Sequence, residues 1–210
     1  WSCDGSPVAT QGRFAQLTLP PQSITVLHRA GERVTEPELE LEFAYSPVLE
    51  NDLIRYEFDE RGQLIHAFDK ELRREMLTAP ANALSLYHDV PNSYDAWNID
   101  LFYENELQEM AKLTGAATLE CGALRQCNRL TFFIGESEIT QFVSLETGSK
   151  RLEFHTLANW RESCKMLRVS FPTSIVSNEC ACEIQYGYVK RGTHRNTSWN
   201  LAQFEMTAHR

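Results

Sequence analysis

The residues best suited to chemistry lie between positions 86 and 104, in the stretch LYHDVPNSYDAWNIDLFYE. From Asp89 onwards it combines three aspartates with four aromatic side chains: Asp89, Asp95, Asp100, Tyr94, Trp97, Phe102 and Tyr103. Aromatic rings stack on sugar faces and carboxylates accept hydrogen bonds from hydroxyls, so the composition suits a carbohydrate. The structural alternative is a buried Trp97 and Tyr94 at a sandwich corner, with Asp95 capping a turn.

A loop must present these side chains, because Pro91 interrupts the apolar residues before it. The run that contains Leu84, Leu86 and Tyr87 is typical of a strand. Pro91 fixes its own backbone and biases Val90 towards an extended conformation, which predicts a turn or loop from Asp89 onwards.

A second group of charged and aromatic residues follows near the C-terminus: Lys190, Arg191, His194, Arg195 and Trp199. A basic cluster beside a tryptophan could neutralise a carboxylate or bind a phosphate. The alternative is a long β-connection with solvated charges, anchored by its tryptophan. A loop histidine such as His194 is more often a hydrogen-bonding residue than a base or a metal ligand.

Composition narrows the function classes. The chain has 210 residues, 42% of them hydrophobic, and a net charge of −9, which argues against a nucleic-acid partner. No apolar run is long enough to span a membrane, so no membrane partner is expected. The start WSCDGSPVAT is not a signal peptide and does not begin with Met, so we expect residue 1 to lie inside a longer polypeptide.

The six cysteines are scattered and form no CxxC pair. Cys180 and Cys182 sit two residues apart in a strand-like run, but a zinc site would need two more ligands. The sequence therefore predicts no metal site here, and free, mostly buried thiols in a reducing cytoplasm.

Alternating apolar and polar residues predict strands along most of the chain. They fall at 13–21, 23–27, 39–45 (with Leu39, Leu41 and Phe43 facing inward), 51–68 with a turn at 59–62, 116–121, 123–135, 137–146, 151–160 and 165–172. The charged segment 70–76 is predicted to be a solvated loop. No helix longer than about two turns is expected, which favours an all-β antiparallel sandwich.

Three segments resemble glycoside hydrolase family 38, the class II α-mannosidases. DVPNSYDAWNID is similar to the family's Asp-x-Pro followed by Asp-Ala-Trp. Residues 183–200 and, more weakly, 160–172 match in the same order, so the resemblance covers roughly residues 40 to 210. It is greatest to the cytosolic, vacuolar and bacterial branch. Gly192 stands where the family usually has Pro, and Asn98 and Asn200 stand where it usually has acidic residues.

The resemblance implies a large, galactose mutarotase-like super-sandwich, incomplete at its C-terminus. Residues 1–35 would be the tail of a small β-module plus a linker, and residues 36–210 the β-sandwich domain. A missing strand would leave an exposed sheet edge through which copies of the chain could form a homo-oligomer.

The family's catalytic machinery is expected elsewhere. The resemblance implies that the nucleophilic aspartate and a zinc ion belong to an N-terminal α/β domain. The His-x-Asp signature of that domain has no counterpart in this sequence. We therefore expect no catalytic residue, metal or cofactor in this chain, and zinc or another divalent metal in that absent domain. The implied partners are the catalytic α/β domain of the same polypeptide and an α-mannoside or mannose-containing oligosaccharide, in the cytoplasm.

The resemblance implies that the longer polypeptide hydrolyses terminal α-D-mannosides with retention. It also implies that this region supports the catalytic domain and lines the rim of the substrate site. The candidate residues for the rim or the interdomain contact are Asp89, Tyr94, Asp95, Trp97, His194, Arg195 and Trp199. Two alternatives stay open: a free-standing carbohydrate-binding or mutarotase-like module, and a purely structural interaction domain.

Overall fold

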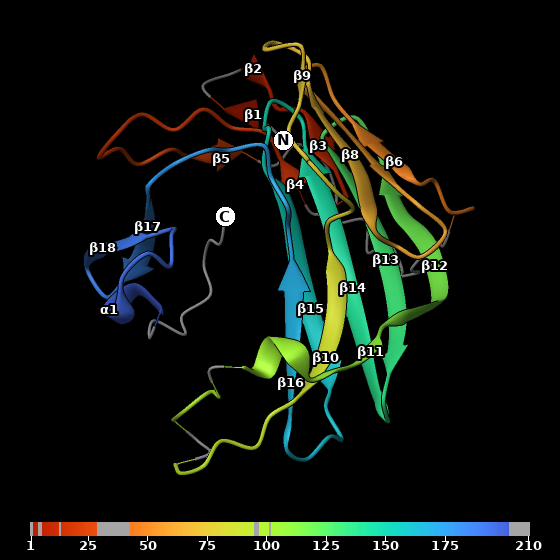
Figure 1. Cartoon of the computed structure of the whole chain (residues 1–210). Coiled ribbons are helices and arrows are strands. Elements are labelled where there is room, and N and C mark those ends of the chain that lie inside the picture. The colour runs from red at the N-terminus through yellow and green to blue at the C-terminus, as the bar shows by residue number, and fades with distance from the viewer. Residues whose placement is uncertain are drawn as a thin grey trace.

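The structure of the chain, a computed structural model, describes residues 2–3, 6–12, 14–28, 43–94, 97–100 and 102–201 (Figure 1). The N-terminal segment holds the short strands β1 (Ser2–Cys3), β2 (Ser6–Pro7), β3 (Thr10–Gln11), β4 (Phe14–Ala15) and β5 (Leu27–His28). The following part holds β6 (Val48–Glu50), β7 (Ile54–Phe58), β8 (Leu64–Asp69), β9 (Arg74–Glu75), β10 (Ala83–His88) and β11 (Leu107–Met110).

The longest strands come next: β12 (Lys112–Cys121), β13 (Arg125–Ile134), β14 (Ser137–Glu146), β15 (Leu152–Asn159) and β16 (Lys165–Ser170). They are followed by β17 (Glu179–Ile184) and β18 (Gly187–Gly192). Within the described residues, helical structure is limited to the 3₁₀ turn η1 (Tyr103–Asn105) and the four-residue α1 (Ser198–Leu201). The prediction of an all-β chain is confirmed.

One layer of the sandwich is the antiparallel sheet β12–β13–β14–β15, which follows the chain order. In β13, Leu130, Phe132 and Ile134 are buried, whereas the residues between them are more exposed. Ile139 and Val143 of β14 point the same way. Successive strand residues face opposite sides of a sheet, so the alternating sequence produces one apolar face.

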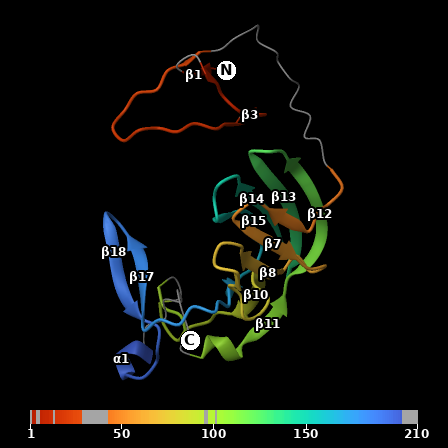
Figure 2. The ribbon, with the colours of Figure 1, turned by 90° about the horizontal axis from the view of Figure 1, so that it is seen from above.

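The other layer consists of the sheets β6–β7–β8–β9 and β11–β10–β16 (Figures 1 and 2). Its inward side chains join those of β13 and β14 in a single core: Leu49, Ile54, Tyr56, Phe58, Leu64, Ala67, Ala81, Leu84 and Leu86. Burial of each large apolar side chain contributes about 1.5–3 kcal/mol, so this core is what holds the two layers together.

A pair of buried amides crosses between the layers. Asn82 Nδ2 donates to Gln141 Oε1 at 2.8 Å, and Gln141 Nε2 donates back to Asn82 Oδ1 at 3.1 Å. Asn82 also donates to the Gly62 carbonyl at 3.2 Å. An unpaired buried amide costs about 1–3 kcal/mol, so this reciprocal pairing favours one alignment of the layers.

The predicted turn at 59–62 is confirmed. Asp59 Oδ1 accepts hydrogen bonds from the amides of Arg61 at 2.9 Å and Gln63 at 2.8 Å. Gly62 has a φ of +73°, and a Cβ at this position would lie 2.8 Å from the Phe132 ring. Glycine therefore serves both the turn conformation and the packing of the core.

The predicted strands at 13–21 and 23–27 are largely wrong. The described residues there form only the two-residue β4 and the first residue of β5, and residues 16–26 form no strand. Leu19 and Ile24 are exposed because this segment has no apolar layer to face. Alternation produces a stable strand only where a partner strand and a core are available.

Three smaller predictions also change. Most of 39–45 lies outside the described residues, and Phe43 makes one bridge to Thr118 but is 46% exposed, so its predicted inward orientation is wrong. The predicted loop at 70–76 is a turn that ends in β9. No disulfide bond joins any of the six cysteines, as predicted, yet only Cys127 and Cys182 are buried. No helix in the described part of the chain is long and apolar enough to cross a membrane.

Asp69 makes the main charged contact between the layers. Its carboxylate accepts hydrogen bonds from the Leu72 amide at 2.9 Å and from Lys150 Nζ at 2.9 Å. The Leu72 amide, followed by the Lys150 ammonium group, lowers the pKa of Asp69. Lys150 lies between β14 and β15, and its carbonyl accepts a hydrogen bond from the Tyr56 hydroxyl at 2.6 Å. The contact thus joins β8 to the far sheet.

We expect Asp69→Asn to lower Tm at pH 7, with a difference from the native chain that narrows as the pH falls. Because the pKa of Asp69 is lower in the folded than in the unfolded chain, its carboxylate stabilises the fold at pH values above the unfolded pKa of about 3.9. This stabilisation is lost as the pH falls through the folded pKa. Circular dichroism melts at neutral and acidic pH measure the difference. Asp52→Asn, at an exposed aspartate, is the matched control. An equal Tm difference at both pH values would contradict this assignment.

Candidate functional site

The loop after β10 turns its aromatic side chains outward. Tyr94 has a φ of 57°, and its carbonyl accepts hydrogen bonds from the amides of Trp97 and Asn98, both at 2.8 Å. Asn98 Nδ2 donates to the Ser93 carbonyl at 2.9 Å, which closes the turn. Trp97 is 87% exposed and Tyr94 75% exposed, so the alternative of a buried pair at a sandwich corner is wrong. Asp95 lies outside the described residues.

Asp100 closes a local turn just before the 3₁₀ turn η1. Its Oδ1 accepts a hydrogen bond from the Phe102 amide at 2.8 Å, and its carbonyl accepts one from the Tyr103 amide at 3.3 Å. A capping role in this loop therefore falls on Asp100. Beyond this turn the two neighbouring aromatic side chains differ in burial: Phe102 is exposed and Tyr103 is buried.

Tyr103 attaches the loop to the sandwich. Its side chain is 2% exposed, and its ring packs edge-on against Tyr87 of β10 with centroids 5.5 Å apart. The Arg168 guanidinium from β16 lies over the same ring, 5.1 Å from the centroid, and donates to the Tyr103 hydroxyl. A cation over an aromatic face contributes about 0.5–2 kcal/mol. The ring thus links the loop to both β10 and β16.

Glu104 connects the loop to the second sequence group. Arg195 binds its carboxylate with two hydrogen bonds, Nη2 to Oε1 at 3.0 Å and Nη1 to Oε2 at 3.3 Å. Arg168 Nη1 lies 3.9 Å from Oε1 of the same carboxylate. Burial, and then repulsion by Arg195, lower the pKa of Arg168. We call Glu104, Arg168 and Arg195 the charge cluster; it holds two positive charges and one negative charge.

The segment after β18 is ordered by local contacts. Thr197 Oγ1 accepts a hydrogen bond from the Asn200 amide at 3.2 Å, so Thr197 caps α1. A Cβ on Gly192 would lie 2.9 Å from Asn200 Nδ2, so the glycine leaves room for this asparagine. His194 Nδ1 accepts a hydrogen bond from the Asn196 amide at 3.4 Å, in agreement with a hydrogen-bonding role. Trp199 on α1 is 70% exposed.

The structure brings part of the predicted site together. Arg195 meets the loop through Glu104, whereas no ring contact joins Trp97 to Trp199 within the described residues. Asp89 lies apart at the end of β10, where its amide donates to the Cys164 carbonyl at 2.9 Å. Its Oδ1 is buried without a hydrogen-bond partner among the described atoms.

Sequence reasoning missed the three residues that hold the site together. Tyr103 and Glu104 lie within the stretch already singled out, but no local pattern distinguishes a buried Tyr103 from the exposed Phe102. Arg168 lies in a separate strand-like segment, and only the pairing of β10 with β16 brings it to the loop.

The arrangement is suited to binding. Exposed rings on a fixed loop, next to a cluster with excess positive charge, are typical of a protein or sugar contact. In the parts of the chain that the structure describes, no three His, Cys, Asp or Glu side chains are grouped so that they could hold a metal ion.

Comparisons with known proteins agree on one family. The family model of the glycosyl hydrolases family 38 C-terminal domain matches residues 49–210. Alpha-mannosidase 2C1 from Homo sapiens is 35% identical over 171 residues, which cover 79% of this chain and 16% of that protein. Alpha-mannosidase 2C1 from Mus musculus is 33% identical over 201 residues, 93% of this chain and 18% of that protein.

A solved structure shows the same fold. The crystal structure of an alpha-mannosidase from Enterococcus faecalis V583 superposes with a TM-score of 0.60 at 19% identity, over 73% of this chain and 20% of that chain. The chain spans between 16% and 20% of the length of these three relatives.

We expect Tyr103→Ala to lower the free energy of unfolding by about 3 kcal/mol, because it removes a buried ring that packs on Tyr87. Phe102→Ala is the matched control, since its ring is exposed and its loss should cost less than about 0.5 kcal/mol. Urea denaturation followed by circular dichroism measures both. Similar losses for the two variants would show that Tyr103 does not anchor the loop.

Proposed function

Since the chain belongs to the C-terminal domain family of glycosyl hydrolases family 38, we propose that it is the non-catalytic β-sandwich of a longer α-mannosidase. In this proposal the longer polypeptide hydrolyses terminal α-D-mannosides with retention, and the sandwich supports its catalytic domain. The relatives named alpha-mannosidase and the fraction of their length that this chain spans support the proposal.

The observation that carries the proposal is the set of exposed rings beside the charge cluster. We call these four rings together the aromatic surface, which is made of two segments: Tyr94, Trp97 and Phe102 on the loop before Glu104, and Trp199 on α1 after Arg195. Hydrogen bonds and the Tyr103 anchor hold the backbone beneath the first three rings. Leaving large rings in water forgoes about 1.5–3 kcal/mol each, so a contact with another domain would stabilise them.

The charge cluster indicates the chemistry of that contact. Arg168 and Arg195 share the one carboxylate of Glu104, although the chain as a whole carries a net charge of −9. Arginine binds carboxylates through paired hydrogen bonds, so an acidic side chain of the catalytic domain would complete the cluster. In the same proposal, one edge of the aromatic surface lies at the rim of the substrate site.

The catalytic groups belong to the remainder of the polypeptide in this proposal. A retaining glycosidase needs two carboxyl groups about 5–5.5 Å apart. Asp100 already accepts a hydrogen bond from the Phe102 amide, and one oxygen of Asp89 is buried, so neither is placed as a free nucleophile. The zinc ion is assigned to the same remainder, because the described residues offer no matching group of ligands.

We also propose a cytoplasmic location. None of the six cysteines forms a disulfide bond, which is the usual state in reducing compartments. Association of copies through a sheet edge stays a prediction. The strands β12 and β15 are the outer strands of their sheet and would be the ones available for it.

The activity test compares the isolated chain with a longer polypeptide that carries the N-terminal domain. We expect only the longer polypeptide to cleave an aryl α-mannoside, and a zinc chelator to stop it. Release of the aryl group is the measurement. Turnover by the isolated 210 residues would contradict the proposal and would direct attention to the aspartates of the loop.

A further inference from the structure

The N-terminal hairpin β3–β4 is held on the sandwich by the side chain of Gln11. Its Oε1 accepts hydrogen bonds from the amides of Leu124 at 2.8 Å and Arg125 at 3.0 Å. Its Nε2 donates to the Arg125 carbonyl at 2.7 Å. The amide therefore pairs with the turn between β12 and β13 as a neighbouring backbone would. A Cβ on Gly122 would lie 2.0 Å from Gln11 Oε1, so any larger residue there would displace the Gln11 amide from this turn.

The same contact places Phe14 of β4 against Arg125. The guanidinium lies 4.7 Å from the ring centroid, and its Nη1 also binds Glu120 Oε1 at 2.6 Å. Two contacts thus hold the arginine in place, one from the N-terminal hairpin and one from β12. A preorganised charged group of this kind loses little entropy when it binds a ligand.

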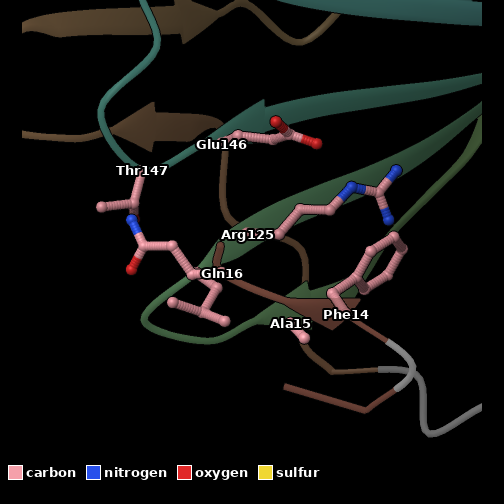
Figure 3. Close-up of a pocket in the computed structure, with 7 residues that line it drawn as sticks. Phe14, Ala15, Gln16, Arg125, Glu146 and Thr147 are labelled. Atoms are coloured by element: carbon pink, nitrogen blue, oxygen red, sulfur yellow. The ribbon is translucent and has the colours of Figure 1, made fainter. Parts of the chain in front are cut away.

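A pocket of about 120 Å³ lies between the hairpin and the sandwich (Figure 3). Its wall includes Phe14 and Gln16 on one side and Arg125, Glu146 and Thr147 on the other. Arg125 and Glu146 are directly paired positions of β13 and β14, so their side chains leave the sheet on the same face. The pocket exists only where the two parts of the chain meet.

Two polar groups in this wall are unused. The Glu146 carboxylate and the Gln16 side-chain amide make no hydrogen bond or ion pair with any described residue. Glu120, Arg125 and Glu146 together carry one net negative charge, which disfavours an anionic ligand. The wall therefore offers free acceptors, a free amide donor and an aromatic ring, without a cationic excess.

We infer that this pocket binds one neutral, hydroxyl-rich ring, a single pyranose. The Glu146 carboxylate and the Gln16 amide would bind hydroxyl groups, and the apolar ring face would pack against Phe14. The volume lies well below the roughly 300–1,000 Å³ of sites for drug-sized ligands, so it admits one ring rather than a chain of them. The pocket shares no residue with the aromatic surface.

The experiment is a titration of the ¹⁵N-labelled chain with methyl α-D-mannoside, followed by amide chemical shifts. We expect saturable shifts at Leu124, Arg125 and Thr147, with a Kd of about 1–10 mM. Glu146→Gln and Phe14→Ala should each weaken binding about tenfold, because one loses a charged acceptor and the other the stacking ring. Both side chains lie at the surface, so both variants should fold.

Trp97→Ala is the matched control and should leave the titration unchanged, because its ring belongs to the aromatic surface. A linear response without saturation, shifts confined to the loop around Trp97, or Glu146→Gln and Phe14→Ala binding like the native chain would each overturn the inference. Saturation by methylammonium chloride with no response to the sugar would overturn it too, in favour of a cation site.

Only the choice of a mannoside as first probe rests on the proposed function. Methyl α-D-glucoside is titrated in parallel, and saturation by either sugar at the same amides supports a pyranose site. If the longer polypeptide lacks mannosidase activity while the sugar still saturates these amides, the proposed function fails and the pocket stands. The reverse result removes the pocket alone.

Discussion

The buried ring of Tyr103 is the contact on which the geometry of the exposed loop depends. The ring sits between Tyr87 and Arg168, and it is almost completely removed from solvent. Because Tyr103 is fixed, its neighbour Glu104 is held where Arg195 can reach it. One buried aromatic side chain thus sets the position of a long loop and links it to a segment near the other end of the chain.

The sandwich supplies the rigidity that this arrangement needs. The core between β13, β14 and the opposite layer fixes β10, and the pairing of β10 with β16 delivers Arg168 to the Tyr103 ring. The polar contacts of Asn82 and Asp69 favour one alignment of the layers. A surface built on such a frame loses little entropy when a partner binds, which is the property required of an interdomain support.

Sequence patterns predicted the elements that local rules control. Alternation identified β12, β13 and β14, Asp59 and Gly62 identified their turn, and Pro91 identified the loop. The same alternation failed at residues 16–26, because no core lies beside that segment. The family assignment came from motifs rather than from these rules, and the comparisons bear it out.

The contacts that define the sites were beyond local rules. Glu104 and Arg195 are separated by 91 positions, and Gln11 and Leu124 by 113. No spacing in the sequence indicates that such residues meet, since only the tertiary pairing of strands brings them together. The burial of Tyr103 beside the exposed Phe102 has the same origin, because the ring packs on Tyr87 of β10 and Arg168 of β16.

In our proposal the catalytic domain of the same polypeptide covers the aromatic surface. Hydroxyl-radical footprinting with mass spectrometry, on the isolated chain and on the longer polypeptide, measures this burial. We expect strong oxidation of Trp97 and Trp199 in the isolated chain and clear protection of both in the longer polypeptide, with Leu72 oxidised equally in the two. Equal oxidation of the two tryptophans in both proteins would contradict it.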